Sequence, residues 1–174
     1  FEADADALQR AWDESNSKFS RAMRSLGTLH MGKSEFTEAC QCYERALTLN
    51  PLYPETWYNL GCCRMRLELF EPAISAFQEV VSIKDDDSES FSNLATCFAA
   101  LGRHPEAHTA ITQAIRFDRR NTKIWENFII IAMNAQIYND VVYGIEEVSR
   151  IHTKWCNVPM IYAASELPID KVRF

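Results

Sequence analysis

Hydrophobic residues in this chain recur with the spacing of an α-helix, in short stretches separated by polar segments. Residues 57, 60, 61 and 64 follow the i, i+3, i+4, i+7 pattern of one helix face, and residues 70, 73, 74 and 77 repeat it. Polar or turn-forming residues at 50–51, 85–88 and 119–122 interrupt the pattern. The sequence therefore predicts pairs of α-helices joined by short connections.

The same pattern occurs four times at a fixed interval along the chain. An internal period of this kind is typical of a solenoid, because a single helix pair cannot bury its apolar face alone and must stack on its neighbours. We expect the large side chains of the pattern, Trp57 among them, to fill the space between one pair and the next. Three of the repeating columns are Met23, Trp57, Phe91 and Trp125; Leu26, Leu60, Leu94 and Phe128; and Ala39, Ala73, Ala107 and Val141.

Small residues predict where the two helices of a pair lie closest together. Glycine or alanine occupies positions 27, 61 and 95, where a bulky side chain would hold the helices apart. The fourth copy departs from the pattern at Ile129, Val141 and Gly144, so close packing is not expected there. We also expect Ser88 and Thr122 to be helix N-caps and Gly102 to end a helix.

The segment Trp57-Tyr58-Asn59-Leu60-Gly61, followed by Ala73 and Phe77, resembles the tetratricopeptide repeat, a helix-turn-helix unit of about 34 residues. The resemblance covers residues 20–153 and implies an all-α, right-handed superhelical solenoid with flanking helices. It implies a helix at 1–19 that ends a preceding unit, repeats at 20–53, 54–87 and 88–121, a degenerate repeat at 122–155, and a closing helix and tail at 156–174.

Composition agrees with a helical protein and disfavours other classes. The 174 residues include only 5 Gly and 6 Pro, too few for an all-β protein rich in tight turns, and 47% are hydrophobic, enough to build a core. The 24 acidic and 18 basic residues give a net charge of −6, which makes an RNA-binding helical repeat only a secondary alternative. We expect no membrane association, because no apolar run is long enough to span a bilayer. We expect no signal peptide, because the sequence does not start with a basic segment followed by an apolar stretch.

Candidate catalytic and metal-binding residues are scattered. The six Cys lack the C-x-x-C spacing of zinc sites, and we expect free thiols in a reducing compartment, the cytoplasm or the nucleus. His104 and His108 lie four residues apart, but no further ligand follows at a useful spacing, and we expect both on the surface. Glu146 and Glu147 are expected on a solvated helix face. The sequence predicts no metal, no cofactor and no enzyme.

In a stacked solenoid the first helix of each pair lines the concave side, where partners bind. Asn59, Asn93 and Asn127 recur on this helix, with Ser25 in the same column. Because asparagine is a poor helix former, the repetition favours a ladder of amides that bind the main chain of an extended peptide. The alternative is that each amide satisfies a backbone group or a neighbouring helix.

The resemblance also suggests a second way of binding, because some members of the family hold a terminal carboxylate with Lys, Arg and Asn. In one set of positions Asn59 and Arg24 fit such a clamp, whereas Glu89 would repel a carboxylate. One repeat later, Asn93 and Lys123 fit. Neither possible set of positions forms a complete clamp. The two sets are Arg24, Thr28, Asn59, Glu89 and Asn93, or, one repeat later, Tyr58, Cys62, Asn93, Lys123 and Asn127.

These observations predict a non-catalytic scaffold that binds a segment of a partner protein in its groove. Segments such as RAMRSLGTLH and TWYNLGCCRMRL further resemble the family of tetratricopeptide repeat protein 27 and its eukaryotic relatives. That resemblance implies a role in chaperone-dependent assembly of larger complexes, with chaperone machinery or spliceosomal assembly factors as partners. The alternative is a rigid spacer that docks within a longer chain, of which this sequence, starting at Phe1 rather than Met, is expected to be a part.

Overall fold

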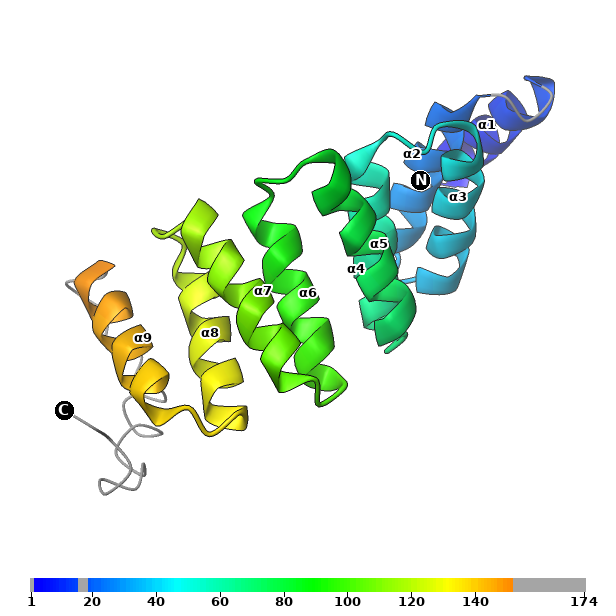
Figure 1. Ribbon diagram of the computed structural model, residues 1–174. Coiled ribbons are helices and arrows are strands. Elements are labelled where there is room, and N and C mark those ends of the chain that lie inside the picture. The colour runs from blue at the N-terminus through cyan, green and yellow to red at the C-terminus, as the bar shows by residue number, and fades with distance from the viewer. Residues whose placement is uncertain (1, 16–18, 152–174) are drawn as a thin grey trace. The chain divides into compact units, whose positions relative to one another are not determined.

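The computed structural model describes residues 2–15 and 19–151, and within these ranges it contains nine α-helices and no strand (Figure 1). The predicted all-α class is confirmed, and helices follow one another in pairs along the chain. The residues group into two compact units, Phe1–Asp85 and Asp86–Phe174. The closing helix and tail expected at 156–174 lie outside the described residues.

The first unit holds five helices, each packed mainly against the next in sequence. The amphipathic first helix is shorter than the predicted 1–19, ending at Glu14. Its Leu8, Ala11 and Trp12 pack against the following helix, where Met23 is fully buried. The five are α1 Glu2–Glu14, α2 Ser20–Gly32, α3 Phe36–Leu49, α4 Pro54–Arg66 and α5 Phe70–Ile83.

The second unit continues the same alternation with α6 Ser88–Ala100, α7 His104–Phe117, α8 Thr122–Asn134 and α9 Tyr138–Ile151. Successive helices pack together, and α8 also contacts α6. The first helices of the four pairs, α2, α4, α6 and α8, begin at the interval that the sequence pattern shows. We propose these starts, residues 20, 54, 88 and 122, as the boundaries of the repeats. None of the described helices is both long enough and apolar enough to cross a membrane.

Two aromatic rings fill the space that glycine leaves between paired helices. A Cβ atom added to Gly27 would lie 2.8 Å from Tyr43 Cε1, and one added to Gly61 would lie 2.7 Å from Phe77 Cζ. Both rings are fully buried. Real Cβ atoms do not approach other atoms so closely, so any larger residue at these positions would force the helices or the rings to move.

The fourth pair is closely packed as well, contrary to the expectation from sequence. The bulky Ile129 occupies the position of the small residue on α8, but Gly144 on α9 faces it. A Cβ atom at Gly144 would lie 2.6 Å from Ile129 Cγ1. The small residue has therefore changed helix, and the close approach is kept with the roles of the two helices exchanged.

The connection within each pair has the same backbone geometry in all four copies. Gly102 adopts a positive φ of 72° just after α6 ends at Ala100, as the sequence predicts. Three other residues adopt φ values near 60° at the same place in their own pairs, although none of them is glycine. They are Ser34, Glu68 and Gln136, so the four positions form one column of the internal period.

Helix N-caps lie one residue earlier than predicted. Asp87 caps α6, because its side chain accepts a hydrogen bond of 3.0 Å from the Ser90 N–H. Asn121 caps α8 by accepting 3.2 Å from the Lys123 N–H. Ser88 and Thr122 are instead the first residues of their helices. A carboxylate or amide reaches the free amide groups as well as a hydroxyl does, so several polar residues in a row left the cap ambiguous.

Two of the repeating tryptophans form a hydrogen bond with the backbone of the loop that precedes their helix. The indole Nε1 of Trp57 donates 2.7 Å to the Pro51 carbonyl, and that of Trp125 donates 2.8 Å to the Arg119 carbonyl. Trp125 is fully buried, whereas Trp57 is only half-buried and packs at the edge of a core cluster. Trp57 is thus less of an interior residue than the pattern predicts.

Burial changes the acidity of several groups in the core of the first unit. It raises the pKa of the Cys63 thiol and of the Tyr43 hydroxyl, each to about 12. It also raises the pKa of Cys40, which lies in the same cluster. Cys63 and Cys97 occupy equivalent core positions of consecutive repeats, and both are fully buried and form no disulfide bond.

We expect Gly61→Ala to lower the free energy of unfolding by about 1 to 3 kcal/mol, because the added methyl group would overlap the Phe77 ring. Gly32→Ala is the matched control, since no atom lies within 4 Å of its new Cβ. That change should be neutral or stabilising by up to about 1 kcal/mol, because alanine favours helix. Urea denaturation of both variants measures the difference, and equal stability of the two would contradict the close approach.

Stability is expected to fall at alkaline pH. Cys63 and Tyr43 hold their protons more tightly when folded than at their ordinary pKa values of 9.0 and 10.0, so their contribution is complete below about pH 9 and is lost as pH rises toward about 12. The measurement is the unfolding free energy from about pH 8 to about pH 11. Cys63→Ala should show a shallower fall than the wild type over this range, and parallel curves would contradict the assignment.

Candidate functional site

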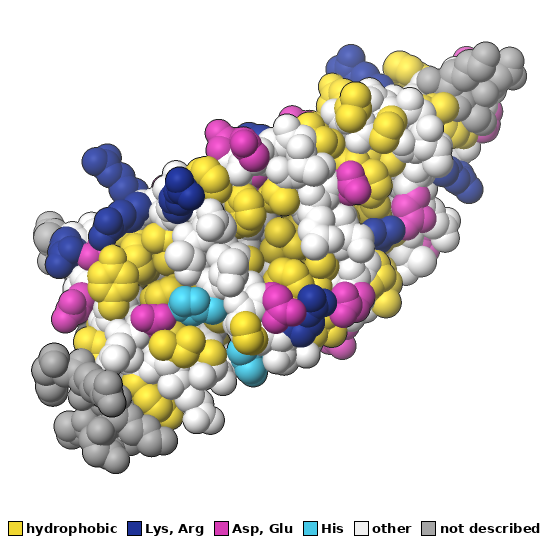
Figure 2. All heavy atoms as spheres, viewed as in Figure 1, with side chains coloured by type: hydrophobic (Ala, Val, Ile, Leu, Met, Phe, Trp, Pro, Cys, Tyr) yellow, Lys and Arg dark blue, Asp and Glu magenta, His cyan; other side chains and the backbone are white. Residues whose placement is uncertain are grey.

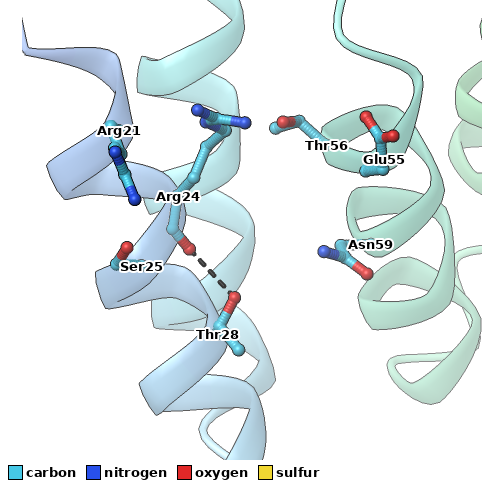
Figure 3. A pocket seen from close by; sticks show the side chains of 7 residues that line it. All are labelled: Arg21, Arg24, Ser25, Thr28, Glu55, Thr56 and Asn59. Atoms are coloured by element: carbon cyan, nitrogen blue, oxygen red, sulfur yellow. Dashed lines mark hydrogen bonds between the residues drawn. The ribbon is translucent and has the colours of Figure 1, made fainter.

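A pocket of about 230 Å³ opens between α2 and α4, the first helices of two consecutive pairs (Figure 3). These are the helices on which the sequence predicts a binding face. The spacing of three, four and seven residues along α2 brings its four lining residues to one side of the helix. The pocket is lined by Arg21, Arg24, Ser25 and Thr28 from α2 and by Glu55, Thr56 and Asn59 from α4.

Arg24 is held in place by an aromatic ring. Its guanidinium carbon lies 3.8 Å from the centroid of the Tyr53 ring, at the distance of a cation–π contact. Its Nε is buried and has no hydrogen-bond partner among the described residues. Figure 3 shows the guanidinium between the two helices, on the side of Thr56. The stacking therefore fixes a cation whose N–H groups are directed at the pocket rather than at a carboxylate of the protein.

Thr56 offers a second polar group. Its side chain is 1% exposed, and no described residue forms a hydrogen bond with its hydroxyl. In Figure 3 this hydroxyl points across the pocket toward Arg24. The hydroxyl of Ser90, in the same column of the next repeat, is likewise buried without a partner in the described chain. Leaving such a buried group unsatisfied costs about 1 to 3 kcal/mol, so this column carries an energetic cost in both repeats.

Equivalent asparagines have different neighbours in the two units. In the second unit Asn127 Nδ2 donates 2.9 Å to the hydroxyl of Ser92, which joins α8 to α6. In the first unit Asn59 stands where Asn127 does, and Arg24 stands where Ser92 does. Asn59 and Arg24 both line the open pocket. The hydrogen bond of Asn127 agrees with the alternative that the amide serves a neighbouring helix, whereas Asn59 faces a space that a ligand can enter.

The other predicted site residues are spread over both units. Tyr58 is half-buried and packs edge-on against Phe77, with ring centroids 5.8 Å apart, so it contributes to the packing of α4 on α5. Asn93 is half-buried on α6, and Lys123 is exposed in the first turn of α8. Neither Tyr58, Asn93 nor Lys123 lines the pocket between α2 and α4.

Three lining residues, Arg21, Glu55 and Thr56, have no part in the sequence prediction. Arg21 and Glu55 occupy one column of the internal period, and its charge changes from copy to copy, so the period does not single it out. Arg21 and Thr56 each lie three residues before a predicted residue, Arg24 or Asn59, and Glu55 lies four before Asn59. This helical spacing was the available signal. With two arginines and one carboxylate, Glu55, the lining carries a net positive charge that suits carbonyl and carboxylate oxygens.

Two titratable residues that the sequence places at the surface, Glu147 and His108, are partly or fully buried in the structure. Glu147 is 4% exposed rather than solvated, because Arg119 Nη2 donates 3.1 Å to one of its oxygens and Arg150 donates to the other. This carboxylate raises the pKa of Arg119. His108 is half-buried, with Nε2 2.6 Å from Asp140 Oδ2. Within the described ranges no three His, Cys, Asp or Glu side chains are placed to hold a metal ion.

Two family models match the chain. One, described as TPR repeat, covers residues 27–62, and another, described as tetratricopeptide repeat, covers residues 54–87. The second of these ranges begins where α4 begins and includes α5. The chain is a tetratricopeptide repeat protein. Tetratricopeptide repeats are in general protein–protein interaction modules and are typically non-catalytic.

Similar proteins occur in distant eukaryotes. TPR repeat-containing protein C19B12.01 of Schizosaccharomyces pombe is 32% identical over 83% of this chain and 18% of its own length. The tetratricopeptide repeat protein 27 homolog of Dictyostelium discoideum is 27% identical over 93% of this chain and 19% of its own length. The repeat family predicted from sequence is confirmed. The tetratricopeptide repeat array spans less than a fifth of the length of either relative.

Solved structures share the fold. The crystal structure of MamA superposes with a TM-score of 0.81 at 15% identity, over 86% of this chain and 87% of that one. YrrB, described as a TPR protein with an unusual peptide-binding site, gives 0.77 at 20% identity, over 93% and 85%. The first TPR of Spaghetti (RPAP3), bound to the HSP90 peptide SRMEEVD, gives 0.65 at 18% identity, over 67% and 93%.

We expect Asn127→Ala to lower the free energy of unfolding by about 1 kcal/mol, because it removes the hydrogen bond to Ser92. Asn134→Ala, which removes an asparagine at the end of the same helix, is the control and should change stability little. Urea denaturation of Asn127→Ala, Ser92→Ala and the double variant measures the coupling between the two side chains. Strictly additive losses would show that the bond contributes nothing.

Proposed function

We propose that this chain is a non-catalytic interaction segment that binds an extended piece of a partner protein along its first helices. The observation that carries the proposal is the α2–α4 pocket, which Arg24, Thr56 and Asn59 line. The Nε of Arg24 and the hydroxyl of Thr56 form no hydrogen bond with any described residue. Such groups suit the carbonyl and carboxylate oxygens of a peptide.

Arg24 and Asn59 are the central residues of the proposed site. Arg24 supplies a fixed positive charge, since the Tyr53 ring restrains its side chain before any ligand arrives and so reduces the entropy lost on binding. Asn59 supplies an amide that can donate to and accept from a peptide main chain at the same time. A ligand held in this way is recognised largely through its backbone and through one anionic group.

The recurrence of asparagine extends the proposal to the other first helices. Asn93 and Asn127 occupy the same column as Asn59, and Lys123 and Tyr58 lie at the start of α8 and within α4. In this proposal each residue contacts the bound segment. Asn127 would do so through its carbonyl oxygen, since its amide nitrogen already donates to Ser92.

The comparisons support peptide binding as the kind of function. Two of the similar structures are described by the peptides or peptide-binding site they contain, although their identity to this chain is at most 20%. The similarity to the tetratricopeptide repeat protein 27 homolog, at 27% identity, supports the further proposal that the partner belongs to chaperone-dependent assembly, including spliceosomal assembly, in the cytoplasm or the nucleus. The full-length protein would bring this segment to its partner.

The test is a selection of random twelve-residue peptides, about the length that an extended groove accepts, on this chain, followed by affinity measurements with the best peptide in solution. We expect Arg24→Ala to weaken binding about tenfold and Asn59→Ala several-fold, because a hydrogen bond to a charged group contributes more than one between neutral groups. The triple variant Asn59→Ala, Asn93→Ala and Asn127→Ala should abolish binding while its helical content is retained.

Gln78→Ala is the matched control, because it removes an exposed amide from α5, away from the pocket. It should bind like the wild type. A version of the peptide with an amidated C-terminus separates the two modes: unchanged affinity supports main-chain recognition, and complete loss indicates a carboxylate clamp instead. If no selected peptide is sensitive to Arg24→Ala or Asn59→Ala, the chain is better described as a spacer.

A further inference from the structure

A second pocket, of about 470 Å³, lies in the second unit on the side of α7 and α9. It is larger than the α2–α4 pocket, and neither Asn127 nor Ser92 lines it. On the face in view in Figure 2, hydrophobic side chains gather over this part of the chain. Basic side chains border them on one edge, and histidine and acidic side chains border them on the other.

The floor of this pocket is apolar and rigid. Trp125 and Phe128 of α8 pack edge-to-face, with ring centroids 5.6 Å apart, and Tyr143 of α9 packs edge-on against Trp125 at the same distance. Tyr143 is 43% exposed, so part of an aromatic wall is open to solvent. Ile115 completes the apolar lining from α7. Such a lining accepts a single large apolar side chain.

The rim is held in place by an ion pair at one point and a hydrogen bond at another. Arg119 Nη2 donates 3.1 Å to the Tyr143 hydroxyl and 3.1 Å to the buried Glu147. On the opposite wall, His108 Nε2 lies 2.6 Å from Asp140 Oδ2. The carboxylates of Glu147 and Asp140 therefore each have a partner within the protein, and the aromatic floor lies between these two walls.

Arg116 is the charge on this rim that has no counterpart. It lies in the last turn of α7, is exposed, and forms no ion pair with any described residue. Its guanidinium stands beside an apolar pocket, where water is partly excluded and a bound carboxylate is attracted more strongly than at an open surface. The positive charge of Arg116 and the apolar lining beside it therefore favour a ligand that carries an acidic group next to an apolar one.

We propose that this pocket binds an acidic peptide of a partner protein, which inserts one aromatic side chain between α7 and α9 and places a neighbouring carboxylate on Arg116. The aromatic side chain stacks on Tyr143 and contacts Phe128. Arg119 stays paired with Glu147 and forms the wall of the pocket. The site is independent of the α2–α4 pocket, so a failure of one leaves the other in place.

The probe is a pair of synthetic peptides with one central Phe, flanked by Asp and Glu in the first and by Lys and Arg in the second. Each is added to the isotope-labelled full chain while the indole N–H signal of Trp125, which reports on the Arg119 carbonyl, is followed by NMR. We expect the acidic peptide to shift this signal and to bind about tenfold more tightly than the basic one. Raising the salt concentration should reduce the difference.

Arg116→Ala should weaken the acidic peptide about tenfold, to the level of the basic one. Arg120→Ala, which removes a nearby exposed arginine that does not line the pocket, should leave binding unchanged. Thr112→Trp places a bulky side chain at the pocket from an exposed position and should abolish binding while the melting temperature is retained. Equal affinity for the two peptides, or insensitivity to Arg116→Ala, would overturn the proposal. So would shifts that depend on protein concentration alone, which would identify a second copy of the chain as the occupant.

Discussion

The close approach of paired helices is the constraint on which the other features depend. Gly27 and Gly61 leave room for the rings of Tyr43 and Phe77, and the ring fixes how the first helix is rotated about its own axis. Once that rotation is set, one side of the first helix is buried and the residues on its other side, Asn59 among them, must face outward. The position of the proposed binding face therefore follows from the packing between paired helices. The exchange of roles at Ile129 and Gly144 shows that the constraint is the sum of the two side-chain volumes rather than the identity of either residue.

On this common frame, single substitutions decide whether a first-helix position is closed or open. Ser92 is short, lies against Asn127 and receives its hydrogen bond, so that polar pair is satisfied within the protein. Arg24, at the corresponding position of the first unit, is longer and turns onto the Tyr53 ring. The amide of Asn59 then lines a pocket instead of a helix contact. Repeats with one backbone thus acquire different surface chemistry at equivalent points, which is how a repetitive fold becomes selective.

The internal period of the sequence was sufficient to predict the helices, because it combines weak local signals from four copies. The starts of α2, α4, α6 and α8 and the core positions of Cys63 and Cys97 follow from it directly. Interactions that occur in only one copy could not be found in this way. The burial of Glu147 depends on Arg119 and Arg150, and no repeating column contains them. The pocket around Arg24 depends on Tyr53, a loop residue outside the helical pattern. The sequence could therefore indicate single candidate residues such as Arg24 and Asn59, but not that they line one pocket.

The four connections with positive φ have a consequence for how such a chain changes over evolutionary time. Ser34, Glu68, Gly102 and Gln136 give every helix pair the same bend at the same point, and within each unit helices contact mainly their neighbours in sequence. The two ends of any segment that is one repeat long therefore lie at equivalent positions and have the same local backbone geometry. If one such segment were duplicated or deleted, each new connection between helices would still have the backbone geometry that the fold needs. In three of the four pairs a non-glycine residue adopts this bend, although the bend opposes the conformational preference of its side chain.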